Sequence, residues 1–144
     1  MMDNTMLLIS RSKYLFELYI NSHLVKNGYE GIVPSHGEII LMLKQHKTLK
    51  MGELASLIQK DPSTVTTLVK KLEKKGFVLL AKGTDDRRAT VAELTPQGET
   101  LYNTIITLSQ NLYTQIYEGI SKDDRIIFRN VLKQININLQ EDID

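Results

Sequence analysis

One group of residues with side chains suited to contacting a polyanion lies between Pro62 and Lys75, in a segment with helical spacing of its apolar residues. Hydroxyl groups can donate to or accept from base edges, and threonine methyls can contact thymine methyls. Lysine ammonium groups act as point charges that suit phosphate oxygens. The hydroxyl candidates for base contact are Ser63, Thr64, Thr66 and Thr67, and the candidates for phosphate contact are Lys70, Lys71 and Lys74. The alternative is a solvated amphipathic helix, whose lysines favour the negative end of its dipole.

A second group, Asp86, Arg87 and Arg88, follows shortly afterwards in a polar link between two apolar stretches. Aspartate suits a turn because it bonds to its own backbone, but adjacent arginines have no role in turn formation. Arginines at the end of a thin ribbon can enter a narrow minor groove, where the potential is most negative. We expect Asp86 to hold the Arg88 guanidinium in a fixed pose. The alternative is an exposed ion-pair cluster that contributes little to stability.

The charge distribution supports a polyanion-binding centre. The 144 residues carry 18 basic and 17 acidic side chains, a net charge of +1, which is not typical of a nucleic-acid binder. Residues 41–90, however, hold 11 basic and 5 acidic side chains, whereas the remainder holds 7 and 12. A nearly neutral total therefore hides a basic middle between two acidic ends.

The elements that must position these groups can be read from periodicity and helix-capping residues. A first helix is predicted to about Lys26, and Ser35 with Glu38 forms a capping-box pattern that opens a second helix. A third helix is expected over Met51–Gln59. Asp61-Pro62 caps a fourth, which ends at Gly76, a residue free to take positive φ.

After the fourth helix the periodicity changes. Residues 77–82 and 90–95 are rich in apolar and β-branched residues, and the link Gly83–Arg88 suits a hairpin. Thr95-Pro96 starts a long helix that Gly119 interrupts, and Ser121 with Asp124 caps a final helix. Two short helices, a tight link and a two-stranded ribbon form a winged helix-turn-helix.

The chain lacks the residues that are characteristic of several other classes of protein. There is no Cys, which excludes disulfides and thiol chemistry, and His23, His36 and His46 have no paired metal-ligand spacing. No nucleophile elbow, phosphate-binding glycine loop or His-Glu-x-x-His motif is present, so no catalytic residue, cofactor or metal is expected. Apolar runs are too short to span a bilayer, and no secretory signal is evident, so a cytoplasmic protein without membrane contact is expected.

Four short motifs in order resemble the MarR family of bacterial transcription regulators. They are Gly52-Glu53-Leu54-Ala55, Pro62-Ser63-Thr64-Val65-Thr66, Leu72-Glu73-Lys74-Lys75-Gly76-Phe77-Val78, and Asp86-Arg87-Arg88 followed by Leu94-Thr95-Pro96-Gln97-Gly98. The resemblance implies a homodimer formed by the first and last helices, repressor binding to palindromic double-stranded operators, and Arg88 in the minor groove. One departure is Lys50, which stands where the family often has a capping Thr.

The resemblance also implies release of DNA by a small aromatic or phenolic ligand. Candidates for ligand contact are Tyr14, Tyr29, His36 and Tyr102. Aromatic residues at helical positions are also common in cores and interfaces, which is the alternative for these four. Apolar seams on the first helix (Leu8, Leu15, Leu18, Val25) and the last (Val131, Leu132, Ile135, Leu139) predict a dimer interface.

We therefore expect an α+β, mostly helical, non-enzymatic DNA-binding regulator with one MarR-type domain over 1–144. Residues 1–30 and 96–144 would form the dimerisation helices, and 34–95 the DNA-binding lobe, with its helix-turn-helix at about 50–75 and wing at about 77–95. The alternative is a winged-helix module for protein–protein assembly without specific DNA readout. RNA binding is disfavoured because the fourth helix and the ribbon tip carry no aromatic stacking residue.

Overall fold

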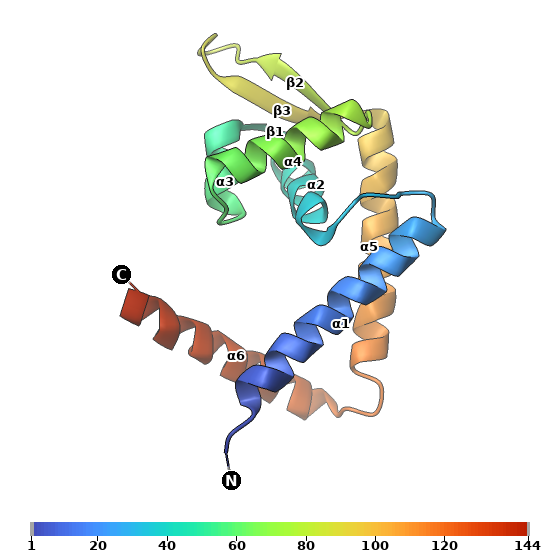
Figure 1. Ribbon diagram of the computed structural model, residues 1–144, viewed down its shortest axis with the longest axis vertical. Coiled ribbons are helices and arrows are strands. Elements are labelled where there is room, and N and C mark those ends of the chain that lie inside the picture. The colour runs from blue at the N-terminus through green and yellow to red at the C-terminus, as the bar shows by residue number, and fades with distance from the viewer. Residues whose placement is uncertain (1, 144) are drawn as a thin grey trace. The chain divides into compact units, whose positions relative to one another are not determined.

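The computed structural model describes residues 2–143 and confirms a mostly helical α+β fold with a small antiparallel sheet (Figure 1). The chain forms two compact units, residues up to Ser109 and residues from Gln110 onward. Its elements are α1 (Thr5–Lys26), α2 (Pro34–His46), β1 (Thr48–Lys50), α3 (Met51–Leu57), α4 (Pro62–Lys74), β2 (Val78–Lys82), β3 (Thr90–Leu94), α5 (Pro96–Ile116) and α6 (Lys122–Ile143).

The sheet has a third strand that the sequence did not predict. Strand order is β1-β3-β2, with Leu49 opposite Ala92 and Leu80 on the other side of Ala92. β1 has only three residues, too few to show the alternation by which a strand is recognised. The ribbon of β2 and β3 is therefore part of a three-stranded sheet, whose third strand, β1, directly precedes α3.

The expected start of α2 was wrong. The helix begins at Pro34, and the backbone N–H of Val33 donates to Nδ1 of His36 at 3.0 Å. Proline suits the first helical position because its fixed φ is already helical and its missing N–H would have no partner there. His36 therefore takes the capping role that Glu38 was expected to have.

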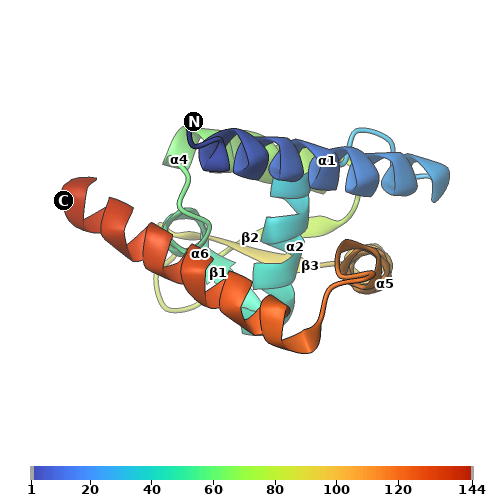
Figure 2. The same ribbon diagram turned by 90° about the horizontal axis from the view of Figure 1, so that it is seen from below.

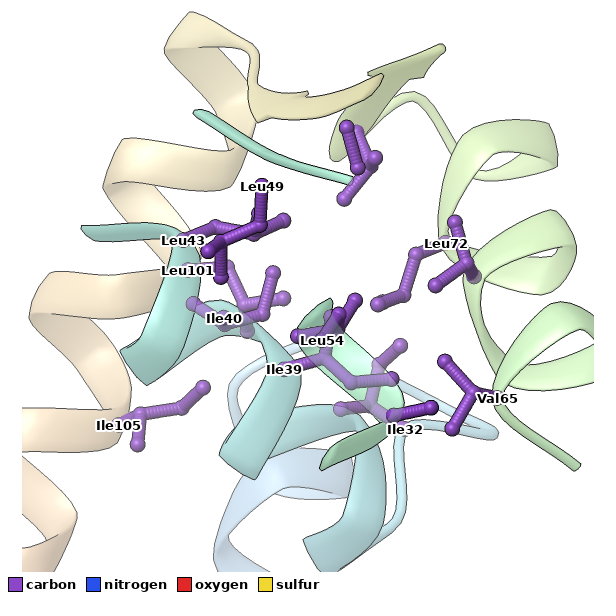
Figure 3. Close-up of a cluster of buried hydrophobic side chains, with 14 of the residues drawn as sticks. Ile32, Ile39, Ile40, Leu43, Leu49, Leu54, Val65, Leu72, Leu101 and Ile105 are labelled. Carbon is purple, nitrogen blue, oxygen red and sulfur yellow. The ribbon is translucent and has the colours of Figure 1, made fainter. Parts of the chain in front are cut away.

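The core of the first unit lies where α2 meets α3, α4, α5 and the sheet. Figure 3 shows Ile39 of α2 beside Leu54 of α3, while Leu101 and Ile105 approach from α5. Ile39, Leu54 and Leu101 are completely buried. Figure 2 shows that α1 passes across one end of α2, so the long first helix is packed against this lobe along only part of its length.

Two short connections fix α4 and the start of α5. Gln59 has a left-handed φ of 53° in the turn between α3 and α4, and Gly76 has φ 84° just after α4. Thr95 caps α5: its hydroxyl accepts from Gly98 N–H at 3.1 Å and donates to the Gly76 carbonyl at 2.5 Å. The end of α4 and the start of α5 are thus held by one side chain.

The second unit contains the end of α5 and all of α6. Ser121 caps α6 as expected, because its hydroxyl accepts from the N–H of Asp124 at 3.1 Å. Arg125 donates to the carbonyl oxygens of Tyr117 and Ile120, both at 3.0 Å, and closes the turn before α6. None of the described residues of α6 is buried.

Candidate nucleic-acid interface

The outward face of α4 carries four of the seven predicted contact residues. Val65, Val69 and Leu72 are buried and define the inward face of this helix. With 3.6 residues per turn, the residues that lie within about 40° of the direction opposite Val65 are Ser63, Thr67, Lys70 and Lys74. Thr64 and Lys71 lie on one flank of the helix and Thr66 lies on the other. All seven were expected on one solvent-facing side: six of them are exposed, Thr66 is half-buried, and helical geometry sorts them into an outward face and two flanks.

The start of α4 is tightly organised around Asp61, as predicted for its N-cap. The Asp61 carboxylate accepts from the Ser63 hydroxyl at 2.5 Å, the Thr64 hydroxyl at 2.5 Å and the Thr64 N–H at 3.0 Å. These hydrogen bonds, that of the Ser63 hydroxyl most of all, hold the pKa of Asp61 well below its usual range. The carboxylate is therefore charged at neutral pH and fixes the side chains at the helix start.

All four predicted base-contacting hydroxyls already donate within the protein. Thr66 donates to the Pro62 carbonyl at 2.8 Å and Thr67 to the Ser63 carbonyl at 3.1 Å, while Ser63 and Thr64 donate to Asp61. A hydroxyl has one donor and two acceptor lone pairs. What these side chains offer a base edge is therefore an acceptor oxygen and, for threonine, a methyl group.

The lysines of α4 face different surroundings. Lys70, with Thr66, lines a largely apolar surface hollow of about 680 Å³ between α3, α4 and the ribbon. Lys50 lines the same hollow and is a second cation there, so it is a candidate contact, although the sequence analysis noted it only where a capping Thr is usual. Lys71 lies elsewhere, with its Nζ 3.1 Å from where a side chain at Gly31 would begin.

The hairpin tip carries the predicted arginines, but Asp86 holds Arg88 in a different way from that expected. The Asp86 carboxylate accepts from the backbone N–H of Arg88 at 2.9 Å, and no ion pair to the Arg88 guanidinium occurs among residues 2–143. The Gly83 N–H donates to the Ala89 carbonyl at 2.9 Å and closes the loop. The carboxylate shapes the backbone at the tip, so the exposed guanidinium is left unpaired within the described chain.

The four residues suggested for ligand contact come from α1, the α1–α2 loop, α2 and α5. Tyr14 is 59% exposed on α1, and the Tyr29 ring packs on Phe77 with centroids 5.8 Å apart. Tyr102 of α5 lies under the ammonium group of Lys44, 5.4 Å from the ring centroid. His36 is buried, and its Nε2 has no hydrogen-bond partner within the described part of the chain. Their role in ligand contact stays a prediction.

Residues 2–143 contain neither a cluster of metal-ligating side chains nor a membrane-spanning helix. No group of three or more His, Cys, Asp or Glu side chains is placed to hold a metal ion. No helix in this range combines the length and apolar character that crossing a membrane requires.

Known proteins share both the sequence pattern and the fold. The MarR family pattern matches residues 32–90. The transcriptional repressor MdtR of Bacillus subtilis is 30% identical over 97 residues, which are 67% of this chain and 63% of MdtR, less than two thirds of that relative.

Solved structures with the same fold include a cysteine-to-serine mutant of MarR from E. coli complexed with operator DNA. It has a TM-score of 0.80 at 19% identity, and the match covers 89% of this chain and 90% of that one. The PcaV regulator from Streptomyces coelicolor in complex with its natural ligand has a TM-score of 0.81 at 15% identity, covering 94% and 96%.

The family match covers α2, the helix-turn-helix and the ribbon up to Thr90, which are the elements that carry the candidate contacts. The structural likeness extends over the long helices as well. Residues 32–90 thus match the MarR family, and the described chain has the winged helix-turn-helix fold of solved MarR structures.

Proposed function

We propose that this protein is a homodimeric, sequence-specific regulator that binds palindromic double-stranded DNA operators in the bacterial cytoplasm and represses transcription. The single observation that carries the proposal is the outward stripe of α4. Its helix start is fixed by Asp61, its polar residues Ser63 and Thr67 come first, and its cations Lys70 and Lys74 follow. Recognition helices present their N-terminal residues to bases, and lysines farther along the helix suit the phosphates.

The ribbon would add a second contact to each half-site. Arg88 is exposed at the tip and has no ion-pair partner within residues 2–143, so its charge is available to a polyanion. An arginine on a narrow ribbon fits the minor groove next to the major groove that α4 would occupy. Lys50 and Arg87 supply further positive charge on the same lobe.

Dimerisation would use the apolar residues that α1 and α6 leave exposed. On α1, Leu8, Leu15, Leu18 and Val25 are each 47–54% exposed. On α6, Val131 and Leu139 are 52% and 56% exposed. Apolar surface of this extent is characteristic of an interface rather than of a monomer. A twofold-symmetric pair would place the two recognition helices about 34–36 Å apart, one turn of DNA.

Release by a small aromatic or phenolic ligand is the second part of the proposal. It is supported by the PcaV complex with its natural ligand and by the buried, unpartnered Nε2 of His36. Buried polar groups without a partner are rare in native proteins, and ligand binding is one explanation for such a group. Thermal-shift screening with aromatic acids and phenols, repeated on His36→Gln, tests this part separately from DNA binding.

The test of the main proposal is a titration of the protein against duplex DNA from upstream of its own coding sequence, at several salt concentrations. Six to ten phosphate contacts per dimer give a slope of log K against log salt of about −5 to −9. Sedimentation should show a dimer rather than a 16.4 kDa species at micromolar concentration. A folded monomer, or equal affinity for upstream and random duplexes, would contradict the proposal and favour an assembly module.

A further inference from the structure

The loop between α1 and α2 rests on the C-terminal end of the recognition helix. The Nζ of Lys75, the C-cap residue directly after α4, donates to the carbonyl oxygen of Glu30 at 3.0 Å. One residue before Glu30, the Tyr29 ring packs on the ring of Phe77, two residues beyond Lys75, at 5.8 Å between centroids. We define the loop–helix joint as these two contacts together with the close approach of Gly31 to the side chain of Lys71.

Gly31 lets the loop and the helix approach closely. It has φ +76°, a conformation that side-chain-bearing residues rarely adopt. A Cβ at this position would lie 3.1 Å from the Nζ of Lys71 and 3.7 Å from the Cε of Lys75. Both lysine side chains therefore extend along the loop, on the flank of α4 that leads away from the stripe of Ser63, Thr67, Lys70 and Lys74.

The neighbouring histidine gives an independent sign that these two lysines are directed at the loop. Burial lowers the pKa of His36 to about 4, with further lowering by the charges of Lys71 and Lys75. His36 caps α2 directly after the loop. The charges of Lys71 and Lys75 therefore reach the start of α2.

We infer that Lys71 and Lys75 are positioning residues, which set the angle of the recognition helix against α1 through the loop–helix joint and make no phosphate contact. The inference rests on the proposed function. If α1 lies in the dimer interface, the joint is the direct mechanical connection between that interface and the C-terminal end of α4. A change in the joint alters the separation and tilt of the two recognition helices, and hence the half-site spacing that the dimer prefers.

The experiment compares two adjacent lysines. A twofold-symmetric duplex is selected from a random pool by the unmodified protein, and two variants of it are made with one base pair added or removed between the half-sites. Affinities of Lys75→Met and of the control Lys74→Met are measured on all three duplexes across a salt series. Lys71→Met and Gly31→Ala are measured in the same way, the latter because it alters the joint without removing a charge.

We expect Lys74→Met to flatten the salt slope by about 1.8, because each dimer loses two contacts worth about 0.9 each. Lys75→Met, Lys71→Met and Gly31→Ala should keep the salt slope, while their preference for the selected spacing falls at least threefold. Lys75→Arg should restore that preference, since a guanidinium can still donate to the Glu30 carbonyl.

Two results overturn the inference. One is a slope for Lys75→Met and Lys71→Met that flattens as much as that of Lys74→Met, which would make these lysines phosphate contacts. The other is an unchanged spacing preference in all three joint variants. Failure of the proposed function looks different, because the unmodified protein would then select no twofold-symmetric duplex at all.

Discussion

The carboxylate of Asp86 accepts a hydrogen bond from the backbone N–H of Arg88 at 2.9 Å, so it shapes the tip of the ribbon, and the guanidinium has no ion-pair partner between residues 2 and 143. We expect Asp86→Asn to bind operator at least as tightly as the unmodified protein, because asparagine keeps the acceptor and removes a negative charge near the phosphates. Asp86→Ala should weaken binding, because the turn loses its hydrogen bond. Gel-shift titration of both variants separates two roles for Asp86. If its carboxylate instead held the Arg88 guanidinium by an ion pair, Asp86→Asn and Asp86→Ala would lose the same operator affinity.

Arg88→Ala should reduce operator affinity at least tenfold, about 1.4 kcal/mol. The loss follows from removing a charge that would lie in the strongest negative potential of the minor groove. Thermal stability and dimer mass should stay unchanged, because exposed charges contribute roughly 0–1 kcal/mol to folding. Lys82→Ala is the control, since it removes one exposed charge from the end of β2, just before the tip loop. Normal operator binding by Arg88→Ala would exclude a DNA-contacting ribbon.

Thr67 provides a test of how the recognition helix reads bases. Its hydroxyl already donates to the Ser63 carbonyl at 3.1 Å, which leaves an acceptor oxygen and a methyl group, and we expect the methyl group to contact a thymine. Thr67→Val keeps a methyl and should retain operator affinity within about threefold, whereas Thr67→Ala should lose about 1–3 kcal/mol on operator only. The readout is the ratio of operator to random-duplex affinity. A large loss for Thr67→Val would show that the hydroxyl oxygen makes the contact.

The elements with strong capping and periodic signals were predictable from the sequence, and those fixed by tertiary contacts were not. Asp61-Pro62 and Gly76 bound α4 as expected, because cap chemistry is local. The start of α2 was missed because His36 is an unusual capping residue that no short-range pattern announces. The different surroundings of Lys71 and Lys74 could not be predicted either, because Lys71 lies beside the α1–α2 loop and the sequence does not show where that loop passes α4.

A matched pair of glycines tests the junction between the ribbon and α5. A Cβ on Gly98 would lie 2.1 Å from the Phe77 carbonyl oxygen, whereas one on Gly52 would meet nothing within 4 Å. Gly98→Ala should therefore destabilise the protein by about 1–3 kcal/mol, the usual cost of overpacking. Gly52→Ala should be neutral or stabilise α3 by up to about 1 kcal/mol. Urea unfolding measures both, and equal free energies of unfolding would contradict the close approach at Gly98.

His36 should make the stability of the fold depend on pH. Burial first, and then Lys71 and Lys75, lower its folded-state pKa to about 4, against 6.5 when it is free. The unfolded chain therefore takes up a proton first as the pH falls. The free energy of unfolding should be at its full value above about pH 6.5 and lose about 3 kcal/mol between pH 6.5 and pH 4 from this group.

Protonation of His36 would also remove the capping hydrogen bond, because Nδ1 can accept from the Val33 N–H at 3.0 Å only while that nitrogen is unprotonated. His36→Gln is the control, because glutamine at this position can accept the same hydrogen bond and does not titrate. Urea unfolding of both proteins at pH 7, 5.5 and 4.5 gives the comparison. Equal losses of the free energy of unfolding in the two proteins would assign the acid sensitivity to other groups. A smaller loss in His36→Gln would assign it to the buried imidazole of His36.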